Sequence, residues 1–183
     1  MLETMAIASG EMVRAAASGD ESAFTALVAR HHRDLLRVAY VICRDTSLAE
    51  DSAQSAWAIA WRRLGEVRDP GQVRGWLVAV AANEARRVMR SRHGRVLELS
   101  TDEIGPGARQ DDRPDPLAAG IDRADLRRAL AKLDPTDRAL IALRFVAELP
   151  SDEIGRALGM SSSGARGRLS RLLVRLREEL RDA

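Results

Sequence analysis

Cysteine, aromatic residues and lysine are all scarce in this sequence, and each shortage narrows what the chain can be. Cys43 is the only cysteine among 183 residues, so an internal disulfide and a cysteine-based metal site are excluded, and we expect a reducing compartment. Aromatic side chains make up only 3% of the residues, which argues against a large β-sandwich and fits small helical units packed with Leu, Ala and Val. Lys132 is the only lysine, and the other basic residues are arginines.

Long hydrophobic runs and a targeting sequence are also lacking. No apolar run approaches the roughly 20 residues that span a membrane, so we expect no membrane insertion. The segment MLETMAIASGEMVRAAASG has no basic n-region and no continuous apolar core, so we interpret residues 1–19 as the N-terminal tail of a cytoplasmic protein. The histidines (His31, His32 and His93) show no ligand spacing, and we expect neither a metal site nor another cofactor.

Charge is distributed unevenly along the chain, although the formal net charge is only +2. Between Val73 and Arg95 there are six arginines and one acid, whereas between Val96 and Pro116 there are six acids and two arginines. Blocks of opposite sign suggest separate surfaces with separate partners. The acidic block also holds three of the six prolines and no sustained apolar stripe, so we interpret residues 96–117 as a flexible acidic linker.

Helical periodicity governs the remaining segments, and neither a strand pattern nor an internal repeat is found. We therefore predict an all-α fold of two small helical domains, at residues 20–95 and 118–183. In the first domain the apolar stripes predict three helices, which end near Ile42, Leu64 and Arg92.

Side chains that can accept a hydrogen bond from a backbone N–H predict where four helices begin. The candidate caps are Ser18 with Glu21, Ser47 with Glu50, Asp134 followed by Pro135, and Ser161 after a turn at Gly159. Two tryptophans, Trp57 and Trp61, fall on the apolar stripe of the second helix, so we favour core packing over base stacking for both.

The last two predicted helices form a short helix, a glycine-containing turn and a longer helix, which is the order of a helix-turn-helix unit. The longer helix has an apolar stripe made by Ala165, Leu169, Leu172, Leu173, Leu176 and Leu180. Small and basic residues are left outward as candidate DNA contacts, namely Ser163, Arg166, Gly167, Arg168, Ser170 and Arg171. An ordinary solvated helix rich in arginine is the alternative.

Two further helix faces carry polar residues at helical spacing. Positions i, i+3, i+4 and i+7 on one side of the third helix are Asn83, Arg86, Arg87 and Arg90. Arginines there can hold phosphates, and an asparagine can read or clamp a base. The polar side of the second helix carries Asp51, Gln54 and Ser55. Spacing alone does not distinguish either face from a solvated surface.

Two stretches resemble a known family. LAEDSAQSAWAIAWRRL followed by RGWLVAVAANEARRVMRSR is similar to region two of bacterial extracytoplasmic-function sigma factors. LDPTDRALIALRFVAELPSDEIGRALGMSSSGARGRLSRLLVRLREEL is similar to their region four. The resemblance covers roughly residues 20–95 and 122–180, in the family's order and with an acidic linker between them. It implies a sigma factor that joins core RNA polymerase, recognises a promoter, opens its strands and is not itself an enzyme.

The resemblance also implies roles for the polar faces. The family's Asp-x-x-Gln, which docks on the polymerase clamp helices, corresponds to Asp51 and Gln54, beside Ser55 where the family carries an acid. The minus-ten element corresponds to the loop 65–72, which contains Arg68, and to the third-helix face of Asn83, Arg86, Arg87 and Arg90. The candidate DNA contacts of the last helix would read the minus-thirty-five element. The polymerase flap region and an anti-sigma factor are further expected partners.

Glycines mark a departure from the family pattern. The family's recognition helix starts Thr-Val-x-Ser where this chain has Gly164, Ala165, Arg166 and Gly167. Glycine within a helix costs about 1 kcal/mol relative to alanine. Either the glycines let the helix approach the DNA backbone closely, or minus-thirty-five reading is relaxed and arginine–phosphate contacts carry most of the binding. We favour the second interpretation, and we interpret Gly155, where the family has alanine, as a further loosening.

Two other functional classes are the alternatives. A helix-turn-helix regulator that never joins polymerase would need neither the Asp51 and Gln54 face nor the linker. A helical adaptor would leave its arginine faces merely solvated. Salt-dependent DNA binding would separate the adaptor from the two DNA-binding classes.

Overall fold

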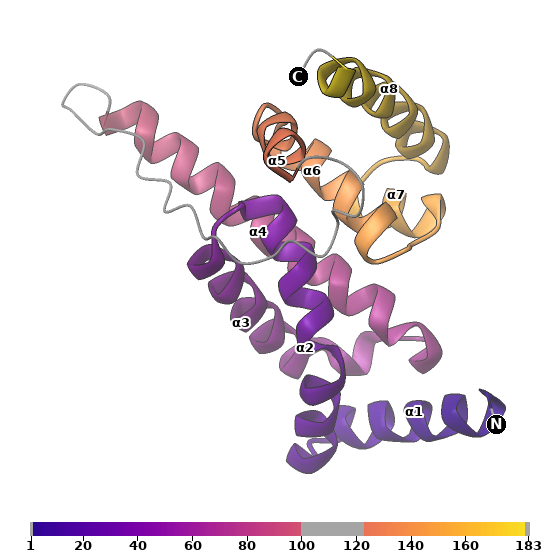
Figure 1. Cartoon of the computed structure of the whole chain (residues 1–183). Helices are drawn as coiled ribbons and strands as arrows, with labels where there is room; N and C mark the ends of the chain where they lie inside the picture. The colour runs from indigo at the N-terminus through magenta and orange to yellow at the C-terminus, as the bar shows by residue number, and fades with distance from the viewer. Residues whose placement is uncertain (1, 100–122, 182–183) are drawn as a thin grey trace.

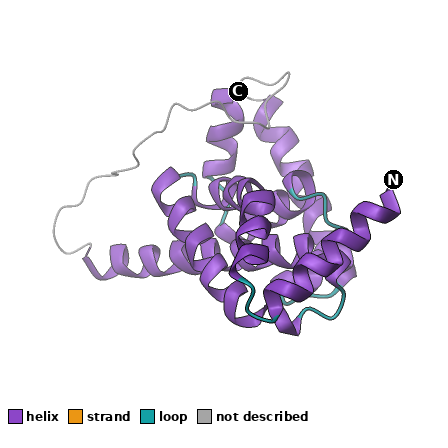
Figure 2. Cartoon of the chain, turned by 90° about the horizontal axis from the view of Figure 1, so that it is seen from below, coloured by secondary structure: helices purple, strands orange, loops and turns teal. Residues whose placement is uncertain are grey.

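The computed structural model describes residues 2–99 and 123–181, and every regular element in these ranges is helical, as Figure 2 shows. The N-terminal domain contains α1 (Leu2–Ala17), α2 (Glu21–Cys43), α3 (Thr46–Arg63), the 3-10 turns η1 (Leu64–Glu66) and η2 (Pro70–Gln72), and α4 (Val73–Leu99). The C-terminal domain contains α5 (Arg123–Ala131), α6 (Pro135–Ile141), the π-helical turn η3 (Ala142–Val146), α7 (Ser151–Leu158) and α8 (Ser162–Arg181). The predicted all-α fold is confirmed.

Helices α2, α3 and α4 pack side by side around the N-terminal core (Figure 1). The core is built from aliphatic residues of α2 such as Leu35 and Ile42, and from a row of alanines on α3 and α4 that lets the helices approach closely. None of the helices in the described ranges is long and apolar enough to cross a membrane.

The predicted N-terminal tail is wrong, because residues 2–17 form α1. This helix packs against α2 and against both 3-10 turns. Val13 and Ala16 are each only 2% exposed, and Gly10 is buried near Pro70 of η2. These buried residues are spaced by three and are mostly small, so they leave a weak hydrophobic signal in the sequence.

Two of the four predicted caps are wrong and two are confirmed. Asp20, not Ser18, caps α2, because its carboxylate accepts hydrogen bonds from the backbone N–H groups of Ser22 and Ala23. Asp45 in the same way caps α3 in place of Ser47. In both cases an aspartate stands directly before the helix and provides a charged acceptor. The caps at Asp134 and Ser161 form as predicted, and Gly159 turns the chain with a φ of 72°.

The C-terminal domain has its own small core between α5, the end of α6 and α8, centred on Leu130, Leu172 and Leu176. Leu173 was expected in this stripe but is 38% exposed. It lies beyond the side of α8 that faces α5 and α6, since Leu172 and Leu176 occupy that side.

The two domains also pack against each other. Leu140, Leu143 and Ile154 of the C-terminal domain are buried in one continuous core with α2 and α4. Helix α4 continues to Leu99, past the predicted end of the first domain at residue 95. The rest of the predicted linker, residues 100–117, lies outside the described residues, so both domain boundaries stay predictions.

Candidate functional site

One exposed face of α3 brings together the residues of the predicted Asp-x-x-Gln motif. Asp51 and Gln54 are exposed and Ser55 is half-buried, while the other side of α3 is buried against α2 and α4. Glu50 is also exposed beside Asp51, so it adds a second carboxylate to this face instead of closing a capping box. The face is acidic, and the helix that carries it packs against α2 and α4.

The two tryptophans of α3 have different surroundings. Trp57 is buried as predicted, and its Nε1–H donates to Nδ1 of His32 over 3.1 Å. Trp61 is 42% exposed, so the prediction of core packing is wrong for it. Both rings meet Phe24 edge to face, at centroid distances of 5.7 Å for Trp57 and 4.8 Å for Trp61. Phe24 thus covers one part of the Trp61 ring and leaves the rest in solvent.

A pocket lies where the loop between α3 and α4 meets α4 and α7. From the N-terminal domain it is lined by Arg63, Glu66, Val67, Arg68, Asp69, Gln72, Gly75, Trp76, Ala79, Val80 and Asn83. From α7 it is lined by Glu153, Arg156 and Ala157. We call it the loop pocket. Its wall carries Arg68 and Asn83, two of the predicted minus-ten residues.

The four predicted residues of α4 do not form a single open face. Asn83 Nδ2 donates to the Ala157 carbonyl over 3.0 Å, so this side chain is turned toward the C-terminal domain. Arg86 bonds both the Asn83 amide oxygen, at 3.0 Å, and the Thr136 hydroxyl, at 3.2 Å. Arg87 is exposed and paired with Glu84 over 2.7 Å, and Arg90 is exposed.

Burial next to other cations lowers the pKa of two arginines between the domains. For Arg86 the main cause is desolvation, followed by the charges of Arg90 and Arg168. For Arg138, which is 6% exposed, desolvation is again the main cause, followed by the charge of Arg44. The Nε–H groups of both Arg86 and Arg138 are buried without an acceptor in the described part of the chain.

The start of α8 presents most of the predicted minus-thirty-five residues to solvent. Ser163, Arg166, Ser170 and Arg171 are exposed, and Gly167 is half-buried. Ala165 points inward and is 2% exposed. The backbone N–H of Gly164 donates to the capping Ser161 hydroxyl over 3.0 Å.

Arg168 lies in the same helix but bonds within the protein. Its Nε donates to Asp137 over 2.6 Å and its Nη2 to Asp134 over 3.0 Å, which ties α8 to the start of α6. The hydrogen bond with Asp137 raises the pKa of Arg168. The sequence pattern predicted Arg168 as an outward DNA contact and did not predict these two partners within the protein.

The interpretation of Gly155 as a loosening is wrong. A Cβ atom at this position would lie 2.7 Å from the Met160 carbonyl oxygen and 3.2 Å from the backbone of Ser161. The Met160 N–H also donates to the Gly155 carbonyl over 2.9 Å. Glycine therefore allows the turn between α7 and α8 to pass close to α7, and it tightens the helix-turn-helix unit.

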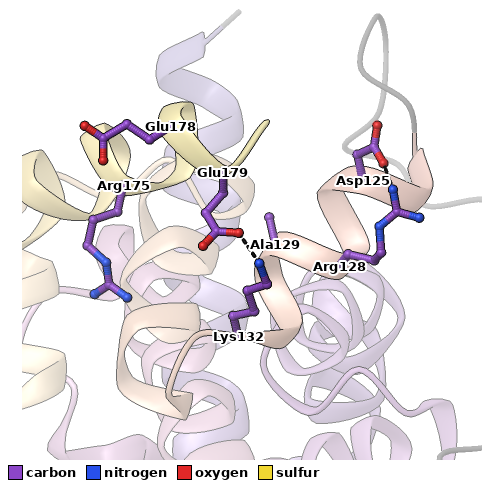
Figure 3. A pocket seen from close by; sticks show the side chains of 7 residues that line it. All are labelled: Asp125, Arg128, Ala129, Lys132, Arg175, Glu178 and Glu179. Carbon is purple, nitrogen blue, oxygen red and sulfur yellow. Dashed lines mark hydrogen bonds and ion pairs between the residues drawn. The ribbon is translucent and has the colours of Figure 1, made fainter. Parts of the chain in front are cut away.

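Charged side chains of both signs line a groove between α5 and α8, shown in Figure 3. Lys132, directly after α5, pairs with Glu179 of α8, and Asp125 pairs with Arg128 within α5. Because acids and bases are mixed here, the groove does not form a basic surface for DNA.

Comparison with known proteins identifies the two domains. Residues 27–95 match the family model of sigma-70 region 2, and residues 123–176 match that of sigma-70 region 4. The RNA polymerase sigma factor CarQ of Myxococcus xanthus is 32% identical over 163 residues, which cover 88% of this chain and 91% of CarQ. The chain belongs to the sigma-70 family of RNA polymerase sigma factors, in its extracytoplasmic-function group.

Solved sigma-factor structures share the fold. The sigma factor RpoE of Bartonella quintana, in complex with the anti-sigma factor NepR, aligns with a TM-score of 0.71 at 22% identity, covering 86% of this chain and 96% of RpoE. CnrH in complex with the cytosolic domain of CnrY aligns with a TM-score of 0.68 at 27% identity, covering 96% of this chain and 98% of CnrH.

The sigma factor described here therefore associates with core RNA polymerase and directs promoter recognition, strand opening and transcription initiation. This sets aside a helix-turn-helix regulator that never joins polymerase. Sigma factors are in general initiation factors and not enzymes.

Proposed function

We propose that this sigma factor docks on the clamp helices of core polymerase through the α3 face of Asp51, Gln54 and Ser55. The proposal rests on the exposure of Asp51 and Gln54, beside the half-buried Ser55, on a helix whose opposite side is buried. Because packing already fixes the backbone of α3, docking through this helix needs no further ordering of the backbone. The chain supplies docking and promoter choice in the cytoplasm, polymerase supplies the catalysis, and the chain itself is not an enzyme.

The minus-ten element is assigned to the loop pocket and to the adjoining side of α4. Single-stranded DNA is held by cationic groups that follow its backbone and by pockets that take its bases. Arg68 and Asn83 line the loop pocket, Arg86 is bonded to Asn83, and Arg87 and Arg90 extend the basic side along α4. We assign base contacts to Asn83 and backbone contacts to the arginines.

The minus-thirty-five duplex is assigned to the exposed start of α8. Ser163, Arg166, Gly167, Ser170 and Arg171 meet the duplex, while Arg168 positions the helix through its two aspartates. The outward side offers arginines and few other side chains that can read base edges, which supports relaxed, phosphate-dominated binding. The flap region of polymerase is the second contact of this domain.

An anti-sigma factor is the proposed regulatory partner. Support comes from the shared fold with RpoE, whose structure was solved with the anti-sigma factor NepR.

Substitution of the α3 face tests the docking assignment. Asp51→Ala with Gln54→Ala should weaken binding to core polymerase at least about tenfold, equivalent to about 1.4 kcal/mol. The measurement is a titration of fluorescent sigma factor with core enzyme. Glu11→Ala, which removes an exposed carboxylate from α1, is the matched control and should bind like the wild type. Equal affinity of the double variant and the wild type, with unchanged circular dichroism for both, would overturn the assignment.

A further inference from the structure

Three arginines gather near the C-terminal end of α2, outside the residues assigned above to DNA and polymerase. Arg44 is the C-cap of α2, Arg127 lies on α5 and Arg138 lies on α6. Arg138 is 6% exposed, while Arg44 and Arg127 are half-buried. Burial is the main cause that lowers the pKa of Arg44, and the charge of Arg127 lowers it further. Since the charge of Arg44 acts on Arg138 in the same way, the three form one arginine cluster.

Carboxylates near the arginine cluster have other partners. Asp134 acts on the charge of Arg138, but its carboxylate already accepts hydrogen bonds from Arg168, over 3.0 Å, and from two backbone N–H groups at the start of α6. Asp45 caps α3 and faces Arg92 over 3.8 Å. Within residues 2–99 and 123–181, no ion pair reaches any guanidinium of the cluster. The cluster therefore keeps an excess of positive charge.

The most buried member of the cluster also lacks a hydrogen-bond acceptor. Arg138 Nε is buried, and it has no acceptor among the described residues. Buried donors are nearly always bonded in folded proteins, so an unbonded one points to a missing partner. The backbone at the end of α2 contributes only about half a negative charge, which is less than a single guanidinium carries. An anion is the partner that would satisfy both the donor and the charge.

The geometry of the donors favours a small phosphate anion. A tetrahedral phosphate presents oxygens in several directions, so guanidinium groups from three helices can bond to it together. The backbone of a DNA strand is less suitable, because α2 and α6 pack against each other and leave Arg138 almost fully covered. Arg44 holds its place at the site through a left-handed backbone conformation, with a φ of 57°.

We infer that the arginine cluster of Arg44, Arg127 and Arg138 binds a small inorganic phosphate anion, such as phosphate or pyrophosphate. Arg138 bonds the anion from the covered side, and the half-buried Arg44 and Arg127 close over it from the solvent side. The site is independent of the residues proposed above for promoter DNA and for core polymerase.

Calorimetric titration of the full-length chain with inorganic pyrophosphate tests the site. In phosphate-free buffer at constant ionic strength, we expect a dissociation constant of about 1 mM or below, the range that two or three charge-assisted hydrogen bonds give. Arg138→Gln and Arg44→Gln should each weaken binding at least about tenfold, because each removes a guanidinium from the site. Arg33→Gln, at an exposed position of α2, is the matched control and should bind like the wild type.

Urea unfolding gives a second readout, which a purely structural role of the cluster would not produce. Without pyrophosphate, Arg44→Gln should be at least as stable as the wild type, because it removes one cation from a group of like charges. With pyrophosphate at about ten times its dissociation constant, the wild type should gain stability and Arg44→Gln should not, because a ligand stabilises only the chain that binds it. Circular dichroism checks that each variant is folded, and Arg44→Gln decides the test if Arg138→Gln is not.

The outcomes are distinct. Loss of pyrophosphate binding in the cluster variants, with binding kept by Arg33→Gln, would support the inference. A wild-type chain that binds no pyrophosphate, or an equal loss in Arg33→Gln, would overturn it. Duplex DNA of mixed sequence that binds through Arg44 and Arg138, in the absence of pyrophosphate binding, would also overturn it, because the cluster would then belong to the DNA surface.

Discussion

Two arginines near the start of α8 carry the same charge but have different surroundings. Arg166 is exposed, whereas Arg168 is bonded to Asp137 and Asp134. Asp137 is buried, so it relies on partners inside the protein. At the scale of single residues, the first arginine is available to DNA and the second holds the recognition helix on α6.

Alanine substitution should separate these two roles. Arg166→Ala should weaken binding to any duplex, reduce the slope of affinity against salt by about 1, and leave stability within about 0.5 kcal/mol of the wild type. Arg168→Ala should cost about 1–3 kcal/mol of unfolding free energy, toward the lower end because its side chain is 38% exposed. Urea unfolding and fluorescence anisotropy measure the two effects. An Arg168→Ala variant with wild-type stability would contradict the positioning role.

Residue patterns predicted contacts well only where the partner is close in sequence. Asp134 was identified as a cap because the backbone N–H groups that donate to its carboxylate lie two and three residues ahead. Trp61 and Leu173 were both expected inside, but their exposure depends on how far the neighbouring helices extend over them. The Arg168 pairs span more than thirty positions, and helical spacing carries no information about such partners.

At the scale of elements, two glycines of the helix-turn-helix unit differ in whether the backbone leaves room for a side chain. Gly155 lies where the turn crosses α7, with no room for a Cβ beside the Met160 carbonyl. Gly167 lies on α8 with room for one, since a Cβ would meet only Arg171 Nη1, at 3.5 Å. Backbone geometry explains the first glycine, while nothing in the structure of the free protein requires the second.

A single methyl group at each glycine should shift stability in opposite directions. Gly167→Ala should raise the unfolding free energy by about 0.5–1 kcal/mol, because alanine has the better helix propensity. Gly155→Ala should lower it by about 1–3 kcal/mol, because the added Cβ forces the turn away from α7. The midpoints of urea unfolding test both. A Gly155→Ala variant as stable as the wild type would show that the turn yields without cost.

At the scale of the whole molecule, the sequence indicated two domains but not their contact. The order of regions two and four follows from local motifs, and the family models match both. The contact between them depends on side chains such as Arg74, Asn83 and Arg86 finding acceptors more than forty positions away. Helix α1 was not predicted for a related reason. The residues that it buries are small, and their burial depends on packing against α2 and the 3-10 turns.

Transcription with purified components tests whether this chain directs initiation by core polymerase. Core polymerase would be incubated with genomic DNA of the source organism, with and without this sigma factor, and the 5′ ends of the RNA sequenced. We expect discrete start sites only when the sigma factor is present, and we expect Asp51→Ala with Gln54→Ala to reduce their use sharply. RNA 5′ ends that are the same with and without the chain, at concentrations where it binds core enzyme, would contradict its role in promoter selection.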